Sequence, residues 1–274
     1  MEKLSNILDL SKLTTPGKPT GLAEISPGVF SCGKHGPEHV EGFGPRHWCN
    51  KCLEEQERDR LQKLQTEHEL SRIRAAHDAL DLPQRFRNCT LANYRVENQG
   101  QTEALKACKD FVSQFPRVGG LVMLGGVGTG KTHLAAATCK ALCDLGHSCH
   151  ITTVARLVRR IKNTWNFNRK AQPGKYDGDW LEPETEEQVI REYIRYELLV
   201  IDEIGSQYGT NTERIVISEI IDRRYNEARS TIIIGNVRLS EAEAQLGKRA
   251  IDRIRDQGRF LLFDWPSLRK PLGL

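Results

Sequence analysis

Short apolar runs alternate with longer amphipathic segments from residue 82 to residue 274. The candidate strands, which have the length of buried strands, lie at 121–124, 149–153, 198–202, 231–235 and 260–263. Between them, apolar residues recur at helical spacing in the segments 131–145, 154–165, 213–228 and 241–256. Strands that alternate with helices predict a parallel sheet covered by helices on both faces, and therefore an α/β fold.

The first 81 residues follow a different pattern. Residues 1–13 predict a short amphipathic helix, and the Pro- and Gly-rich stretch 14–28 predicts a linker. Residues 30–52 combine Cys and His with Gly and Pro and contain too few apolar residues to fold without a staple. Residues 53–80 are charged and contain no Gly or Pro, which predicts a solvated helix. We predict three parts: an amino-terminal region at 1–52 with a small module at 30–52, a charged helical connector at 53–81, and a larger domain at 82–274.

A complete phosphate-loop motif follows the first strand predicted in the larger domain. Residues 125–132 read GGVGTGKT, which fits G-x-x-x-x-G-K-[ST] in full, and a helix is predicted to begin near Lys131. Glycines let backbone N–H groups converge on phosphate oxygens, and the helix N-terminus adds partial positive charge. We expect Lys131 to reach the β- and γ-phosphates of ATP and Thr132 to bind Mg²⁺. The predicted nucleotide-contacting residues are Gly125, Gly126, Val127, Gly128, Thr129, Gly130, Lys131, Thr132 and His133.

Acidic and polar residues end two further predicted strands. Asp202 and Glu203 close the apolar run LLVI, and Asn236 follows the strand at 231–235. Side chains at the carboxyl ends of parallel strands face the ligand crevice of an α/β sheet. We expect Asp202 to hold Mg²⁺, Glu203 to polarise the attacking water, and Asn236 to hold that water beside the γ-phosphate.

Three of the eight cysteines lie close together and predict a metal site. Cys32, His35, Cys49 and Cys52 form a C-x₂-H pair and a C-x₂-C pair separated by 13 residues, which is typical of a tetrahedral structural Zn²⁺ site. His39 and His47 lie nearby and could replace His35. Four protein ligands leave no open position for a substrate, so the expected zinc is structural rather than catalytic.

The net charge of +4 conceals an uneven distribution of charge. Residues 156–175 contain seven basic residues and no acid, with Trp165 and Phe167 among them, a pattern that suits single-stranded DNA. The alternative is an amphipathic helix with solvated arginines. The acidic stretch 177–192 could pair with the basic one in the monomer and would then be autoinhibitory. No apolar run is long enough to span a membrane and no signal peptide is evident, so we expect a cytoplasmic protein.

Together these motifs resemble those of AAA+ ATPases and, within them, the bacterial replicative-helicase loaders of the DnaC type. The resemblance extends over about residues 82–270 and is most specific in the sequences NYRV, at 93–96, and DRIR, at 252–255. It implies a P-loop NTPase (AAA+) sheet without a full lid domain and an ATPase that is slow without partners. It also implies ATP-dependent loading of a hexameric replicative DNA helicase onto single-stranded DNA during replication initiation.

The resemblance also suggests roles for arginines and for the amino-terminal region. Arg253 resembles an arginine finger that reaches ATP on a neighbouring subunit, which implies a homo-oligomer when ATP is bound; Arg269 resembles a sensor arginine. Arg249, four residues earlier, is the alternative finger, and an ion pair of Arg253 with Asp252 or Asp256 is the structural alternative. Adenine recognition would fall to residues 86–94. Some related loaders carry a zinc module in the same place, so region 1–52 is expected to bind the helicase, with nucleic acid as the competing partner.

Two other functions stay open at this point. Transposition-helper ATPases of the IstB type share much of the pattern and would assemble on duplex DNA. A non-enzymatic adaptor would use its nucleotide and zinc only for docking, but the intact Lys131, Asp202 and Glu203 argue against that function.

Overall fold

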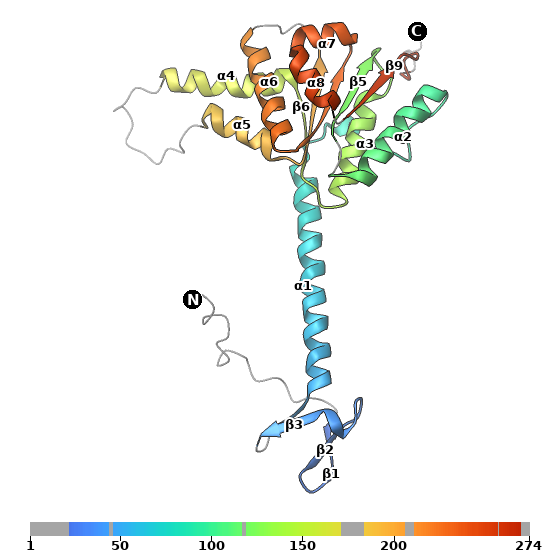
Figure 1. Ribbon diagram of the computed structural model, residues 1–274, viewed down its shortest axis with the longest axis vertical. Helices are drawn as coiled ribbons and strands as arrows, with labels where there is room; N and C mark the ends of the chain where they lie inside the picture. The colour runs from blue at the N-terminus through green and yellow to red at the C-terminus, as the bar shows by residue number, and fades with distance from the viewer. Residues whose placement is uncertain are drawn as a thin grey trace. The chain divides into compact units, whose positions relative to one another are not determined.

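The computed structural model describes residues 22–43, 46–116, 119–170, 184–205, 211–256 and 258–269 (Figure 1). The helix predicted at 1–13 lies outside them. The chain divides into two compact units, Met1–Glu69 and Leu70–Leu274, and the division falls within helix α1, Asn50–Ala79. No helix of the described residues is long and apolar enough to cross a membrane.

Two short hairpins precede α1. Strands β1 (Leu22–Ser26) and β2 (Val29–Cys32) pair antiparallel, as do β3 (Val40–Phe43) and β4 (Arg46–Cys49), and the short helix η2 (Pro37–His39) lies between the hairpins. The linker predicted at 14–28 is therefore wrong at its end. Gly28 has a φ of 79°, so the Pro and Gly residues there form a hairpin turn rather than a flexible stretch.

The charged helix predicted from residue 53 is present and begins slightly earlier, at Asn50. Cys52 therefore lies in its first turn. Ala76, near the other end of α1, is buried in the core of the second unit together with Leu80 and Leu82.

A five-stranded sheet forms the centre of the second unit, with strand order β6-β7-β8-β5-β9. All four neighbouring pairs are parallel, as the alternation of strands and helices predicts. The strands are β5 (Leu121–Gly125), β6 (Cys149–Thr153), β7 (Leu198–Ile204), β8 (Ser230–Gly235) and β9 (Arg259–Phe263).

Helices cover both faces of this sheet, and the buried residues of each strand alternate between two cores (Figure 1). Met123 and Val200 pack with the helices α2 (Gln99–Gln114) and α3 (Lys131–Cys143) on one face. Val122 and Ile201 face the other side. The helices there are α4 (Val154–Lys170), α5 (Glu186–Arg195), α6 (Asn211–Asn226), α7 (Leu239–Leu246) and α8 (Lys248–Asp256).

Two differences from the predicted helices have local causes. The sequence pattern missed α2, whose start is fixed by a capping box between Asn98 and Gln101. The single helix predicted at 241–256 is two helices, α7 and α8, because Gly247 takes a φ of 85° between them.

The buried guanidinium of Arg224, on α6, binds groups of α5, of the residues that follow α5, and of β8. The Arg224 side chain is 0% exposed, and its guanidinium donates to the Thr231 hydroxyl over 3.0 Å. Its remaining N–H groups donate to the backbone carbonyls of Tyr193, Ile194, Tyr196, Glu197 and Ser230. Burial lowers the pKa of Arg224 to about 9. The arginine thus satisfies the polar backbone where α5 leads into β7.

Candidate functional site

The phosphate loop connects β5 to α3 and needs glycine at two positions for steric reasons. A Cβ on Gly125 would lie 2.1 Å from the Phe263 carbonyl oxygen of the neighbouring strand β9. A Cβ on Gly130, whose φ is 95°, would lie 2.8 Å from the Tyr94 ring. Side chains at these positions would displace the loop from the sheet edge, so the glycines permit both its curvature and its packing.

The Lys131 ammonium lies inside the loop. It donates to the Gly125 carbonyl over 3.0 Å and to the Gly126 carbonyl, and it lies 3.3 Å from the Thr129 hydroxyl. Burial lowers the pKa of Lys131, while the charge of Asp202 opposes the change. A half-buried cation surrounded by neutral oxygens is suited to exchange them for charged phosphate oxygens.

The structure joins the phosphate loop to the acidic strand. The Thr132 hydroxyl donates to Asp202 Oδ2 over 2.8 Å, although the two residues are 70 positions apart. Asp202 Oδ1 accepts the Glu203 backbone N–H over 2.6 Å. Burial raises the pKa of Asp202, and the bond from Thr132 partly offsets this. A hydroxyl and a carboxylate are the hard oxygen ligands that Mg²⁺ takes, so the pair fits the predicted ion.

Glu203 and Asn236 lie at the same edge of the sheet. The pairing of β7 with β8 is irregular between Ile201 and Ile204, and Glu203 has a φ of 62° within that bulge. Left-handed backbone at a non-glycine residue is uncommon and is concentrated at functional sites. Asn236 is exposed directly after β8, whose neighbours are β7 and β5. Glu203 and Asn236 therefore both lie near the carboxyl end of β8.

The predicted arginines have different surroundings. Arg269 Cδ lies 3.5 Å from the position of a Cβ on Gly128, and its charge helps to lower the pKa of Lys131, so Arg269 lies beside the loop. Arg253 instead forms an ion pair with Asp222 of α6 and is 16% exposed. The partner is thus neither of the aspartates considered on α8. Arg249 lies 3.7 Å from the same carboxylate and is 76% exposed.

His133 and Tyr94 connect α3 to the segment 86–94. His133 Nε2 lies 3.2 Å from the Thr90 carbonyl and 3.1 Å from Asn93 Oδ1, and its ring meets the Tyr94 ring edge-on. The segment expected to recognise adenine therefore lies against the first turn of the helix that follows the phosphate loop.

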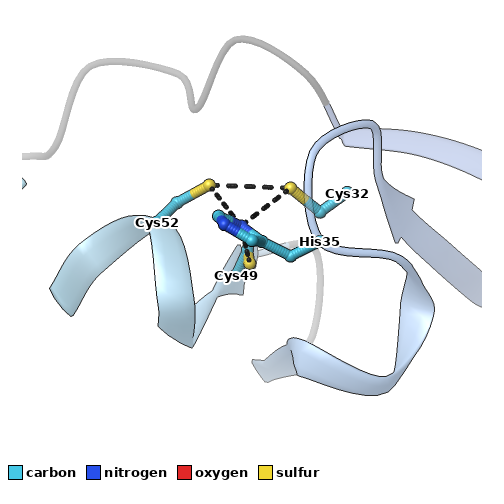
Figure 2. Close-up of side chains that lie close together, drawn as sticks. All are labelled: Cys32, His35, Cys49 and Cys52. Atoms are coloured by element: carbon cyan, nitrogen blue, oxygen red, sulfur yellow. Dashed lines mark hydrogen bonds between the residues drawn. The ribbon is translucent and has the colours of Figure 1, made fainter. Parts of the chain in front are cut away.

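The four predicted zinc ligands come together in the first unit (Figure 2). Their donor atoms all lie within 4.8 Å of one another. Cys32 ends β2, Cys49 ends β4 and Cys52 lies in the first turn of α1, so both hairpins and the helix meet at the cluster. His47 stacks on Phe30 instead of joining it. Three sulfurs and one imidazole nitrogen at this spacing fit tetrahedral Zn²⁺.

Groups beside the cluster prepare it for a cation. His35 Nδ1 faces the three sulfurs, 3.3 Å from Cys52 Sγ, while its Nε2 lies 3.3 Å from Glu55 Oε1. Glu55 is also bound by the Lys34 ammonium. Hydrogen bonds from the Lys34 and His35 backbone lower the pKa of Cys32 to about 6, which favours the thiolate that binds metal.

The basic helix α4 is partly paired with acids. Arg160 donates to Glu184 over 3.1 Å and also to Glu192, and these bonds raise the pKa of the arginine. The Trp165 indole N–H donates to Glu186 Oε2 over 2.6 Å. The pairing between the basic and acidic stretches is therefore present, and it occupies the polar group of Trp165. The side chains of 166–170 and the segment 171–183 lie outside the described residues.

The sequence pattern assigned no role to two residues at these sites, Glu55 and Trp265. Glu55 lies three residues after Cys52 on the same helix, and that spacing was the available signal. The Trp265 indole donates to the Thr129 carbonyl of the phosphate loop across 136 positions, and no local pattern announces such a contact. All eight cysteines are free, as the sequence predicts for metal ligands or thiols.

Comparison with known proteins identifies relatives of this chain. The sequence model of the family described as IstB-like ATP binding protein matches residues 53–270. The replicative helicase loader DnaC of Escherichia coli K12 is 34% identical over 213 residues, which cover 77% of this chain and 78% of that protein.

Solved structures agree with this. The crystal structure of the DnaC helicase loader is similar with a TM-score of 0.55 and 29% identity, and covers 66% of this chain and 99% of that one. The crystal structure of DnaI has a TM-score of 0.54 at 20% identity, covering 69% of this chain and 95% of that one, which shows a shared fold.

Proposed function

The chain belongs to the IstB-like ATP binding protein family of AAA+ ATPases, and from this premise we propose that it uses ATP to load a hexameric replicative DNA helicase onto single-stranded DNA. The contact between Thr132 and Asp202 carries the proposal, because it joins the phosphate loop to the acidic strand as Mg²⁺-ATP requires. The 34% identity to a replicative helicase loader over 77% of the chain supports the helicase as the partner.

The residues divide the work at the nucleotide as follows. The loop N–H groups and Lys131 bind the phosphates, and Arg269 beside the loop adds positive charge. Thr132 and Asp202 would hold Mg²⁺, which when bound neutralises charge that develops on the phosphates. Glu203 accepts a hydrogen bond from the attacking water and Asn236 orients that water.

We propose that ATP binding assembles the chain into a homo-oligomer through an arginine supplied by the neighbouring subunit. Arg253 would have to leave Asp222 to serve as this finger, whereas Arg249 is 76% exposed and would lose only a 3.7 Å contact. The ion pair therefore favours Arg249. Arg253 then orients Asp222, which lies between the two arginines.

The amino-terminal unit is proposed to bind Zn²⁺ through Cys32, His35, Cys49 and Cys52 and to dock on the helicase. The cluster at the meeting point of two hairpins supports a folded docking module. DNA contact is assigned to the exposed Arg156 and Arg159 on α4. Arg160 and Trp165 of the same helix are hydrogen-bonded to acids. A chain with these partners would act in the cytoplasm.

The proposal is tested by co-purification with the host replicative helicase, with and without ATP. We expect the full chain to retain the helicase and a chain that begins at residue 70 to lose it. If the truncated chain retained the helicase, the first unit would not be the docking module.

The second candidate is a transposition helper, which the family description itself favours. Such a protein would form cooperative filaments on duplex DNA with ATP. If the protein forms filaments on duplex DNA and does not retain the helicase, the transposition-helper function is supported and the loader function is wrong.

A further inference from the structure

Three donors from outside the phosphate loop bind its carbonyl oxygens. The Trp265 indole N–H donates to the Thr129 oxygen over 2.9 Å, and the Tyr94 hydroxyl donates to the same oxygen over 3.4 Å. The Leu268 backbone N–H donates to the Gly128 oxygen over 2.9 Å. We name Tyr94, Trp265 and Leu268 the carbonyl cap. Its two aromatic side chains are 6% and 7% exposed, so water does not compete for these bonds.

The carbonyl cap binds oxygens next to the first N–H groups of α3, which have no partner within the helix because α3 begins at Lys131, after Gly130 in the left-handed region. In a regular helix, Thr132 N–H would donate to the Gly128 oxygen and His133 N–H to the Thr129 oxygen. Within the described part of the chain, no acceptor takes either N–H, and the first helical bond runs from Leu134 to Gly130 over 3.0 Å. These donors therefore remain available at the positive end of the helix.

Peptide geometry extends the effect into the loop. The C=O and N–H of one trans peptide point in opposite directions. A Thr129 carbonyl fixed on Trp265 and Tyr94 therefore directs the Gly130 N–H away from them, and a Gly128 carbonyl fixed on Leu268 does the same for the Thr129 N–H. No acceptor among the described residues takes these two N–H groups either.

We propose that the carbonyl cap is a positioning device for the phosphates of a bound nucleoside di- or triphosphate. Trp265 and Tyr94 touch no phosphate; they hold the Thr129–Gly130 peptide so that its N–H faces the β-phosphate. The inference rests on the proposed nucleotide site, because these residues act only through the phosphate loop. It makes Trp265, which follows β9, a determinant of the affinity for nucleotide.

The test removes single donors and measures the affinity of the full chain for ATP and ADP by titration with fluorescent analogues. Trp265→Phe keeps a ring beside Phe263 and removes the indole N–H. We expect both affinities to fall by roughly 5- to 20-fold, since one hydrogen bond that aims a second donor is lost. The hydrolysis rate at saturating ATP should change less than the affinity.

Tyr94→Phe removes the longer bond and should lower both affinities by about two- to threefold. Both donors share one oxygen, so the double variant should lose more than the product of the single losses. Trp165→Phe is the matched control, since it removes the same kind of N–H from Glu186, and nucleotide affinity should stay unchanged.

Thermal unfolding without nucleotide separates positioning from folding. A folded Trp265→Phe variant with affinities within twofold of the unaltered chain would overturn the proposal, as would an equal loss in Trp165→Phe. If Trp265→Phe does not fold, Tyr94→Phe decides, and a folded Tyr94→Phe variant whose affinities equal those of the unaltered chain would overturn the proposal. A failure of the unaltered chain to bind ATP would instead overturn the nucleotide site itself. Binding that Lys131→Ala abolishes and Trp265→Phe leaves intact would overturn the carbonyl cap alone.

Discussion

The Cys/His cluster and the phosphate loop are both assembled from residues distant in sequence, but they are held in place by different forces. Among the described residues of the first unit, Cys32 and Cys49 are the only buried apolar side chains. The phosphate loop rests on a five-stranded sheet with a core on each face. One site must therefore supply the stability of its own unit, while the other is supported by a unit that is already stable.

Loss of the metal should have the largest effect and should be confined to the first unit. Cys49→Ser, or removal of Zn²⁺ by a chelator, is expected to unfold the hairpins, since structural zinc contributes about 10 kcal/mol to small modules. Circular dichroism and proteolysis would show the first unit digested and the second intact, with ATP affinity unchanged. Loss of ATP binding on chelation would show that the second unit also depends on the metal, and would contradict this prediction.

Replacement of Arg224 should destabilise the second unit and leave the first unit unchanged. Arg224→Met leaves buried carbonyl oxygens at Tyr193, Ile194 and Ser230 without a donor, so the free energy of unfolding of the second unit should fall by about 3 kcal/mol or more. Chemical denaturation measures this, and zinc content should remain one ion per chain. Arg223→Met, on the same helix but only partly buried, is the control and should cost under about 1 kcal/mol.

The carboxylate beside the cluster should tune the metal site without building it. Glu55→Gln weakens the acceptor that faces His35 Nε2, and such changes typically lower zinc affinity by about 10- to 100-fold. Competition with a chromophoric chelator gives the affinity directly. Glu54→Gln is the matched control one position away, and an equal loss in that variant would show a general charge effect.

The smallest effect concerns a charge that function requires and the fold disfavours. Burial raises the pKa of Asp202 above its unfolded value, so its contribution to stability is greatest below that unfolded value and is lost as pH rises through the raised pKa. Asp202→Asn should therefore make the second unit slightly more stable at neutral pH, with a smaller gain in acid, and should abolish hydrolysis. Unfolding midpoints at several pH values check the sign; a less stable variant at neutral pH would contradict it.

The sequence predicted the second unit well because its signals are local. Four of the five strands of the sheet contain an apolar run, and the meeting of Thr132 with Asp202 follows from a motif with a known strand–loop–helix context. The hairpins of the first unit were missed because pairing of polar strands leaves no apolar pattern. The bond from Trp265 to the Thr129 carbonyl and the buried bonds of Arg224 depend on the folded backbone, which composition and spacing do not describe.

We propose that ATP bound at this phosphate loop drives the loading of a helicase. The most direct measurement follows the host replicative helicase onto circular single-stranded DNA in the presence of this protein and ATP. We expect the unaltered chain to leave helicase on the DNA, and Lys131→Ala to leave none while it still binds the helicase through its first unit. Equal loading by Lys131→Ala, or no loading by the unaltered chain, would contradict it.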